Sequence, residues 1–435
     1  MRIGGRRFFY GWVIVAGLLA SGSVITAMGG VNSGQFIKPM TEELGIGQTW
    51  FGWAQTARLI GFAGSSYFIG RIIDARGARL PMLAAGLIMG GVLVGLSQVH
   101  HGWQIVVLFA FAGLTGLQGQ GGNLYNSVTI SRWFRFRRGR ALSVAFLGTP
   151  IGIFIFAPTT QWLIDTYGWR QAWLTLAILG PAVIGLVALV IVRRSPEDVG
   201  ALPDGFTPDE IATAAAADAR ARGETADDAV EYSFTRPEAM RTPTFWRLAA
   251  VDGLRQVAVT TLGLFRIPFY VDQGIDPGIV ALALSAEAAV GSVITIPTGW
   301  LVDRVEPKWV SAFATAFMIG TFGVTIMVSE PWHVFVATIM YGIGAVSFNL
   351  SQQTIWPRYF GPLHIGQIRG ISMILGISVA SLGAPATGMS QDYLGSFLPA
   401  WIVAMVLLGV ATVTLITLPR PSRQDRAQVE ADAAD

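Results

Sequence analysis

The stretch VDGLRQVAVTTLGLFRIPFYVDQG, residues Val251 to Gly274, has the length and apolar character of a membrane-spanning helix. A span of the hydrocarbon core needs about 20 mainly apolar residues. Three charged residues interrupt this one, namely Asp252, Arg255 and Arg266. Because an unpaired charge facing lipid is strongly unfavourable, the charged side of the helix is expected to face protein or water. The segment therefore predicts a bundle of membrane helices whose polar groups are kept away from lipid.

The composition of the whole chain is typical of a membrane protein. Of the 435 residues, 52% are apolar and only 13% are charged, whereas a soluble chain has about 25% charged residues. The chain has no cysteine, which excludes a disulfide framework, a thiolate metal site and a cysteine nucleophile. The net charge of +3 comes from arginines that lie between apolar runs rather than on one face, so we expect no nucleic-acid partner.

Twelve apolar runs of spanning length recur along the chain, six on each side of a charged segment rich in Ala, Pro and Gly. They cover residues 10–35, 50–73, 80–98, 103–131, 140–163, 171–192, 244–271, 278–302, 309–328, 333–355, 367–389 and 397–418. We therefore predict an all-α membrane protein with twelve transmembrane helices in two pseudo-symmetric six-helix bundles. The first run is too long for a signal peptide and is expected to be retained as a span.

The expected domain organisation follows from these runs. It consists of an N-terminal bundle, a cytoplasmic linker, a C-terminal bundle and a cytoplasmic tail, at residues 1–193, 194–241, 242–420 and 421–435. One short helix is expected in the linker, around Pro208 to Arg222. Arginines concentrate in alternate connections, so we expect a multi-pass protein of the cell inner membrane, embedded in its lipid bilayer, with both termini cytoplasmic.

The two halves carry matched loop sequences. GRIIDARGAR follows the second run and GWLVDRVEPK follows the eighth. Each has a Gly four residues before an Asp, which is Asp74 in the first loop and Asp303 in the second. An internal duplication explains this match.

Twelve spans in two halves, with DARGAR between the second and third spans, resemble the major facilitator superfamily. Within it, RWFRFRRGRALSVAFLGTPIG, RRSPEDVGALPDG and RTPTFWRL resemble the branch of monocarboxylate transporters and oxalate/formate antiporters. The resemblance covers nearly the whole chain. It implies a secondary transporter that moves an organic anion by alternating access of its two halves.

Charged residues near the ends of the spans are candidates for gates. Asp74 can accept hydrogen bonds from a neighbouring helix N-terminus or an arginine and so lock one side of the carrier. Arg76, Arg79 and Asp303 are further gating candidates in the matched loops, although anchoring on the cytoplasmic side explains the two arginines equally well. Arg266, near the other end of its helix, is a candidate for an extracellular gate.

Few ionisable residues are expected at depth in the membrane, and each is a candidate for function. They are Arg58, Asp252, Arg255, Arg266 and Glu287. At about 100° per residue, Arg255 and Arg266 lie on one face of their helix. Arg255 and Glu287 both fall near the middle of their helices, where transporters bind substrate, so they are the best-placed pair. The sequence leaves open whether they meet.

Two interpretations of these residues remain open. In the functional one, Arg255 or Arg58 holds a substrate carboxylate. Glu287 then takes a proton, with Asp252 as a second candidate for proton coupling. In the structural one, Asp252, Arg255 and Glu287 form a salt-bridge network that ties two helices together.

Polar residues on corresponding helices of the two halves are candidates to complete a binding site. Asn123 and Tyr125 of the fourth span and Asn349 of the tenth are the residues we select, with hydrogen bonding between helices as the alternative. Thr295 and Gly376 stand where members of the resembled family carry an arginine and a lysine. Oxalate, which would need two cations, is therefore disfavoured. A monocarboxylate or a larger, less charged acid is expected.

The absence of other motifs narrows the function. The sequence has no phosphate-binding loop, no metal-ligand spacing and no Ser/His/Asp set, so we expect no use of ATP, no cofactor, no metal and no enzymatic activity. We predict a monomeric secondary active transporter that moves a small, monocarboxylate-like organic anion together with a proton. Proton-driven efflux of an amphipathic compound and a transport-incompetent nutrient sensor are the alternatives.

Overall fold

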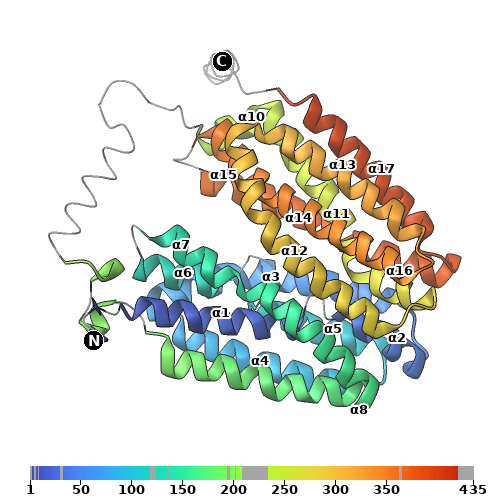
Figure 1. Cartoon of the computed structure of the whole chain (residues 1–435), viewed down its shortest axis with the longest axis horizontal. Helices are drawn as coiled ribbons and strands as arrows, with labels where there is room; N and C mark the ends of the chain where they lie inside the picture. Colours follow the sequence, from blue (N-terminus) through green and yellow to red (C-terminus); the bar gives the residue numbers. More distant parts are fainter. Residues whose placement is uncertain are drawn as a thin grey trace. The chain divides into compact units, whose positions relative to one another are not determined.

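The computed structural model describes residues 2–3, 6–7, 9–29, 33–117, 124–134, 137–193, 196–200, 202–207, 234–361 and 365–419 (Figure 1). These residues are almost entirely helical. The departure is a pair of two-residue strands, β1 (Arg2–Ile3) and β2 (Arg6–Arg7), which pair antiparallel. Within the described part, eight helical stretches are long and apolar enough to cross a membrane, and two shorter apolar helices add to them.

The first half of the chain contains helices α1 to α8. They are α1 (Gly11–Ala27), α2 (Ser33–Leu44), α3 (Thr49–Arg76), α4 (Arg79–Ser97), α5 (Gly102–Leu114), α6 (Leu124–Trp133), α7 (Arg138–Phe146) and α8 (Gly148–Leu186), followed by a π-helical turn at Val187–Ile191. The first and fourth spans are each made of two helices, α1 with α2 and α5 with α6. Gly168, at φ 82° and ψ 161°, breaks α8, which therefore contributes to two consecutive spans.

The second half begins with a short helix and continues with seven longer ones. They are α10 (Arg236–Arg241), α11 (Pro243–Asp272), α12 (Pro277–Arg304), α13 (Pro307–Ile326), α14 (Pro331–Phe360), α15 (Ile365–Ala380), α16 (Gly383–Leu394) and α17 (Leu398–Ile416). Helix α11 starts where the sequence predicts, because Thr242 Oγ1 accepts a hydrogen bond from Phe245 N at 3.3 Å and Pro243 occupies the first turn. With α15 and α16 counted as one span, the described helices make the expected twelve.

Parts of the linker can be described and parts cannot. Two short 3₁₀ turns, Pro196–Val199 and Pro203–Gly205, follow the first half, and α10 precedes α11. The helix expected around Pro208 to Arg222 lies outside the described residues, as does the tail at 421–435.

The chain divides into two compact units. One comprises Met1–Ile46 and Ala57–Ala229, and the other comprises Gly47–Thr56 and Val230–Asp435. In the first unit, α8 packs along α1 and α4. Gly148 of α8 lies so close to the backbone of α1 at Leu19 that there is no room for a Cβ, which explains a glycine at this crossing.

The first turns of α3 belong to the second unit, where they pack against α16. Both carboxylate oxygens of Asp392 accept hydrogen bonds there, Oδ1 from Gln48 N and Oδ2 from Thr49 N, each at 2.8 Å. Thr56 Oγ1 donates to the backbone oxygen of Ser381. Asp392 thus caps the N-terminus of a helix that is distant in the sequence.

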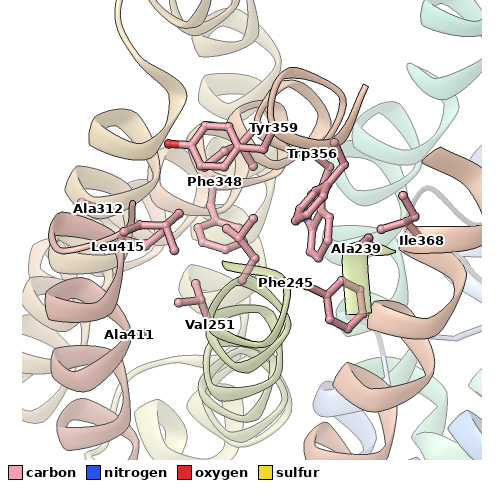
Figure 2. Close-up of a cluster of buried hydrophobic side chains, with 14 of the residues drawn as sticks. Ala239, Phe245, Val251, Ala312, Phe348, Trp356, Tyr359, Ile368, Ala411 and Leu415 are labelled. Carbon is pink, nitrogen blue, oxygen red and sulfur yellow. The ribbon is translucent and has the colours of Figure 1, made fainter. Parts of the chain in front are cut away.

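The remaining helices of the second unit form its core. Helix α14 packs on α12 and α13, while α11 packs on α15, α16 and α17. A hydrophobic cluster joins α10, α11, α13, α14, α15 and α17, as Figure 2 shows. Phe348 and Trp356 of α14 are 2% and 0% exposed within this cluster, so their rings are fixed by packing.

Candidate functional site

Two buried arginines of α11 reach the aromatic rings of α14. The Arg255 guanidinium carbon lies 4.1 Å from the centre of the Phe348 ring, and that of Arg266 lies 4.1 Å from the centre of the Tyr341 ring. The arginines are eleven residues apart and the rings seven, and both spacings return to the same helix face at about 100° per residue. A stripe of cations on α11 therefore faces a stripe of rings on α14.

Arg266 has a buried acid as its partner. Its Nη2 lies 2.7 Å from Oε2 of Glu287 on α12, and the arginine and glutamate side chains are only 1% and 13% exposed. The sequence leaves open whether Arg255 meets Glu287, and in the structure the ion pair of Glu287 is with Arg266.

The helix geometry explains this pairing. α11 and α12 are consecutive and joined by one short loop, so depth is best counted from that loop. Arg266 is about 9 Å from the end of α11, Glu287 about 15 Å from the start of α12, and Arg255 about 25 Å from the end of α11. Glu287 is therefore closer in depth to Arg266 than to Arg255, and the long arginine side chain spans the difference.

Arg255 has no such partner in the described part of the chain. Its guanidinium makes one long hydrogen bond, 3.5 Å from Nη1 to Oε1 of Gln256, and its buried Nε makes none. Only 6% of the residue is exposed. A buried cation with an unfilled donor needs an anion or a polar group, because leaving it unpaired is costly. Arg255 is thus a buried cation of the second unit that has no acid paired with it among the described residues and could receive an anionic ligand.

Asp252 lies one turn before Arg255 on α11 and is partly buried. Its Oδ2 accepts a hydrogen bond from Ser372 Oγ of α15 at 3.5 Å, and it interacts electrostatically with Arg255 and with Arg369 of α15. Over the described residues, it makes no ion pair within 4.0 Å. The site therefore contains an acid, Asp252, and a neighbouring cation, Arg255, that do not form an ion pair.

Trp356 forms the wall next to Asp252. Its Nε1 donates to Oε1 of Gln352 at 3.0 Å, which leaves the buried Nε2 of Gln352 without a hydrogen-bond partner. Because Phe348 and Trp356 belong to one packed cluster (Figure 2), the ring under Arg255 and the indole beside Asp252 are held by the same core.

The candidates of the first unit have different environments. Arg58 is 6% exposed in α3, with its Nη1 close to Gly29. Tyr125 is 2% exposed, and its hydroxyl donates to the backbone oxygen of Thr115 at 2.9 Å. That bond fixes the end of α5 and uses the hydroxyl hydrogen. Asn123 lies outside the described residues.

Asn349 of α14 is exposed. It is next in the chain to Phe348, so it does not share the helix face that meets Arg255. Asn349 is therefore adjacent to a site residue in the sequence, but it does not lie on the face of α14 that contacts Arg255.

The gate candidates are only partly described. Arg79 Nη2 donates to the backbone oxygen of Leu189 at 2.8 Å, which ties the start of α4 to the end of the sixth span. Arg76 is the exposed last residue of α3. Asp74 and Asp303 lie in α3 and α12, and their side chains lie outside the described part of the structure.

Several contributors to the site were missed from the sequence. They are Tyr341, Phe348, Trp356, Gln256, Arg369 and Ser372. The seven-residue spacing of Tyr341 and Phe348 places both rings on one face of their helix, as the eleven-residue spacing does for the two arginines. Gln256 and Ser372 carry no comparable signal. Among the described residues, no group of three or more His, Cys, Asp or Glu side chains that could hold a metal ion occurs.

Comparison with known proteins places these features in a family. The model of the Major Facilitator Superfamily matches residues 19–254 and 248–434. Monocarboxylate transporter 11 of Mus musculus is 26% identical over 365 residues, covering 81% of this chain and 75% of the mouse protein. Monocarboxylate transporter 2 of Homo sapiens is 23% identical over 364 residues, covering 79% and 72%.

Solved structures show the same fold at low identity. A bacterial homologue of the human lysosomal transporter Spinster superposes with a TM-score of 0.72 at 14% identity, over 97% of this chain and 99% of that one. The nucleoside transporter NupG superposes with a TM-score of 0.70 at 13% identity, over 93% and 99%. These likenesses concern the arrangement of the helices.

Proposed function

The chain belongs to the major facilitator superfamily and is therefore a membrane transporter rather than an enzyme, and we propose that it moves a small organic monoanion with a proton. In this proposal it is a secondary active symporter of the inner membrane with both termini in the cytoplasm. The names of the similar monocarboxylate transporters support a carboxylate as the anion.

The proposal rests mainly on one observation, which is that the buried Arg255 guanidinium has no acid paired with it among the described residues. A guanidinium buried against Phe348, with an unfilled Nε donor, offers a carboxylate charge-assisted hydrogen bonds in a fixed plane. The ring covers one face of the cation, which leaves the edge for in-plane contact. A planar carboxylate fits this edge better than a neutral hydroxyl does, because only the carboxylate neutralises the buried charge.

The charge of the substrate follows from the second arginine. Arg266 is neutralised by Glu287, so it offers no further cation to a ligand. Of the two buried arginines of α11, Arg255 is then the one that can balance a negative charge on the ligand. This favours a monocarboxylate over oxalate or another dianion, in agreement with the missing arginine and lysine at Thr295 and Gly376.

The apolar surroundings favour an organic body on the anion. Phe348 and the cluster behind it present an aromatic surface beside the guanidinium (Figure 2). Inorganic anions would leave this surface wet, whereas a carboxylate with a short carbon chain covers it. Two acids near the arginines, Asp252 and Glu287, are available for coupling to a proton.

Uptake into proteoliposomes tests the proposal. Labelled lactate, pyruvate and butyrate are offered with an inward proton gradient to the wild type, Arg255→Gln and Arg255→Lys. We expect accumulation by the wild type, loss in Arg255→Gln and weak residual uptake in Arg255→Lys, since a lysine keeps the charge but not the planar edge. Arg247→Gln is the matched control, because Arg247 is an exposed arginine of the same helix.

Three outcomes would count against the proposal. Equal uptake by the wild type and Arg255→Gln would remove Arg255 from the binding site. Uptake of an amphipathic compound in place of all carboxylates, driven by an outward rather than an inward proton gradient, would favour proton-driven efflux. No transport of any tested compound, with folded protein in the vesicles, would favour the sensor.

A further inference from the structure

We propose that Gln352 of α14 is a further substrate-binding residue, which donates from its amide nitrogen to the carboxylate held by Arg255, and that Trp356 fixes the direction of that amide. This inference rests on the proposed function and deepens it, because it adds a second named contact to the same site. It starts from a buried polar group that has no partner in the described part of the chain.

Gln352 lies between two contacts that join α14 to α11. Phe348, four residues earlier, lies against the Arg255 guanidinium. Trp356, four residues later, lies next to Asp252. Residues four apart share one side of a helix, with their Cβ atoms about 5–6 Å apart. The Gln352 side chain therefore faces the same part of α11 as Phe348 and Trp356 do, at an intermediate height.

Trp356 determines which end of the Gln352 amide faces the site. The indole Nε1 donates to Oε1 of Gln352 at 3.0 Å. An indole N–H can only donate, so the amide oxygen must face the indole and the amide nitrogen must point elsewhere. Exchanging the two atoms would place two donors against each other. The amide therefore offers hydrogen-bond donors, and not an acceptor, to a ligand.

The amide nitrogen of Gln352 is unfilled among the described residues. Gln352 is 3% exposed, and its Nε2 is buried without a hydrogen bond. The buried Nε of Arg255 is in the same condition. An unfilled buried donor costs free energy, whereas a carboxylate has two oxygens and can accept from two groups at once. One carboxylate between α11 and α14 therefore satisfies a donor on each helix.

The charges around the site favour one anion there. Ionised Asp252 interacts electrostatically with Arg369 of α15 and, more weakly, with Arg255. Two cations and one acid leave this group with a single positive charge, which a monoanion neutralises. Arg266 also has buried donors without a partner, Nε and Nη1, but Glu287 already pairs with its charge. A neutral molecule such as water is enough to fill those two donors.

Uptake into proteoliposomes at varied substrate concentration tests the inference, with lactate, pyruvate or butyrate, whichever the wild type accumulates. Gln352→Leu keeps the bulk of the side chain and removes its donors. We expect its KM to rise about ten- to a hundredfold, as for the loss of a hydrogen bond to a charged group, while the maximal rate changes much less. Gln353→Leu is the matched control with an unchanged KM, because Gln353 is the next residue of α14 and is exposed.

A second variant separates the loss of the donor from the loss of the bond to Trp356. Gln352→Glu keeps an oxygen that accepts from the indole and replaces the amide donor by an acceptor. Its KM should therefore rise at least as much as that of Gln352→Leu, although the indole keeps its partner. Thermal unfolding in detergent reports on folding and packing in each variant separately from transport.

A double variant tests the positioning role of Trp356. Trp356→Phe keeps an aromatic ring in the core but removes the indole N–H, so the amide is free to turn and the KM should rise about two- to tenfold. If Trp356 acts through the amide, Gln352→Leu combined with Trp356→Phe should have the same KM as Gln352→Leu alone. Effects of the two substitutions that simply multiply would overturn the role assigned to Trp356.

The outcomes at Gln352 are distinct from those that decide the proposed function. An unchanged KM in Gln352→Leu and Gln352→Glu overturns the inference, because the amide nitrogen then does not contact the substrate. Equal changes in Gln352→Leu and Gln353→Leu overturn it as well. In both cases the proposed function stands if Arg255→Gln abolishes uptake. A wild type that takes up no carboxylate overturns the proposed function and this inference with it.

Discussion

Arg266 and Glu287 form an ion pair, Nη2 to Oε2 at 2.7 Å, while Arg255 on the same face of α11 lies against a ring, makes a long contact to Gln256 and has no ion pair within the described part of the chain. Two arginines of one helix face thus differ. One is paired with an acid of the protein, and the other is the residue that we propose receives the ligand. Substitutions at and around the two arginines should therefore have different effects, on stability at Arg266 and on anion binding at Arg255.

Removing one residue of the Arg266–Glu287 ion pair should destabilise the protein more than removing both. Arg266→Gln or Glu287→Gln alone leaves one buried charge unpaired, which costs about 3–5 kcal/mol. The double variant removes both charges, so we expect it to be more stable than either single variant. Thermal unfolding in detergent measures the order of the three. A double variant that is less stable than both single variants would show that the charges are not mutually compensating.

Phe348 should tune the affinity of Arg255 for its anion. The ring holds the guanidinium plane, and a cation–π contact contributes about 0.5–2 kcal/mol, so Phe348→Leu should weaken anion binding by about two- to thirtyfold. Phe348→Trp keeps an aromatic face and should weaken it less. Uptake at varied substrate concentration measures the apparent affinity.

Phe360→Leu is the control for Phe348. Phe360 belongs to the same hydrophobic cluster and is 0% exposed, but the contact of Arg255 is with Phe348. The Phe360→Leu variant should be less stable than the wild type, because packing is lost, but its apparent affinity for the anion should be unchanged. An equal loss of affinity in both variants would mean that the cluster acts through general packing.

The positions of the helices could be predicted from the sequence because hydropathy and length determine them. The expected run 278–302 lies within α12 (Pro277–Arg304), and the expected run 244–271 lies within α11 (Pro243–Asp272). The division of the first span into α1 and α2 was not predicted, since apolar residues continue across the break. Gly168 lies in the gap between the expected runs 140–163 and 171–192, and its non-helical φ and ψ angles divide α8 there.

The site could be predicted only in part. The residue types at depth, Asp252, Arg255, Arg266 and Glu287, follow from composition, because charges inside apolar runs are conspicuous. Their partners do not, since an arginine side chain can reach acids one or two turns away along a neighbouring helix. Ring contacts are harder still, because aromatic residues are common in every span.

Gly342 should be required for the position of Glu287. A Cβ at this residue of α14 would lie 2.9 Å from Cγ and 3.1 Å from the backbone oxygen of Glu287. Gly342→Ala should therefore displace α12 or the glutamate side chain and lower the melting temperature. Gly344→Ala is the matched control, because its Cβ would meet the backbone oxygen of Ala314 at an ordinary 3.5 Å. A Gly342→Ala protein as stable as the Gly344→Ala protein would contradict this account.

Asp392 should stabilise the second unit by capping α3. Its two carboxylate oxygens accept from Gln48 N and Thr49 N, and loss of an N-terminal cap costs about 0.5–2 kcal/mol. Asp392→Ala should therefore lower the melting temperature, and Asp392→Asn should lower it less, since the amide keeps one acceptor oxygen. Asp276→Ala provides the comparison, because Asp276 caps α12 from its own adjacent residue. Only the Asp392 variants should alter transport as well as stability, because only this cap joins segments far apart in the chain. Unchanged transport in Asp392→Ala would show that this contact contributes to stability and not to transport.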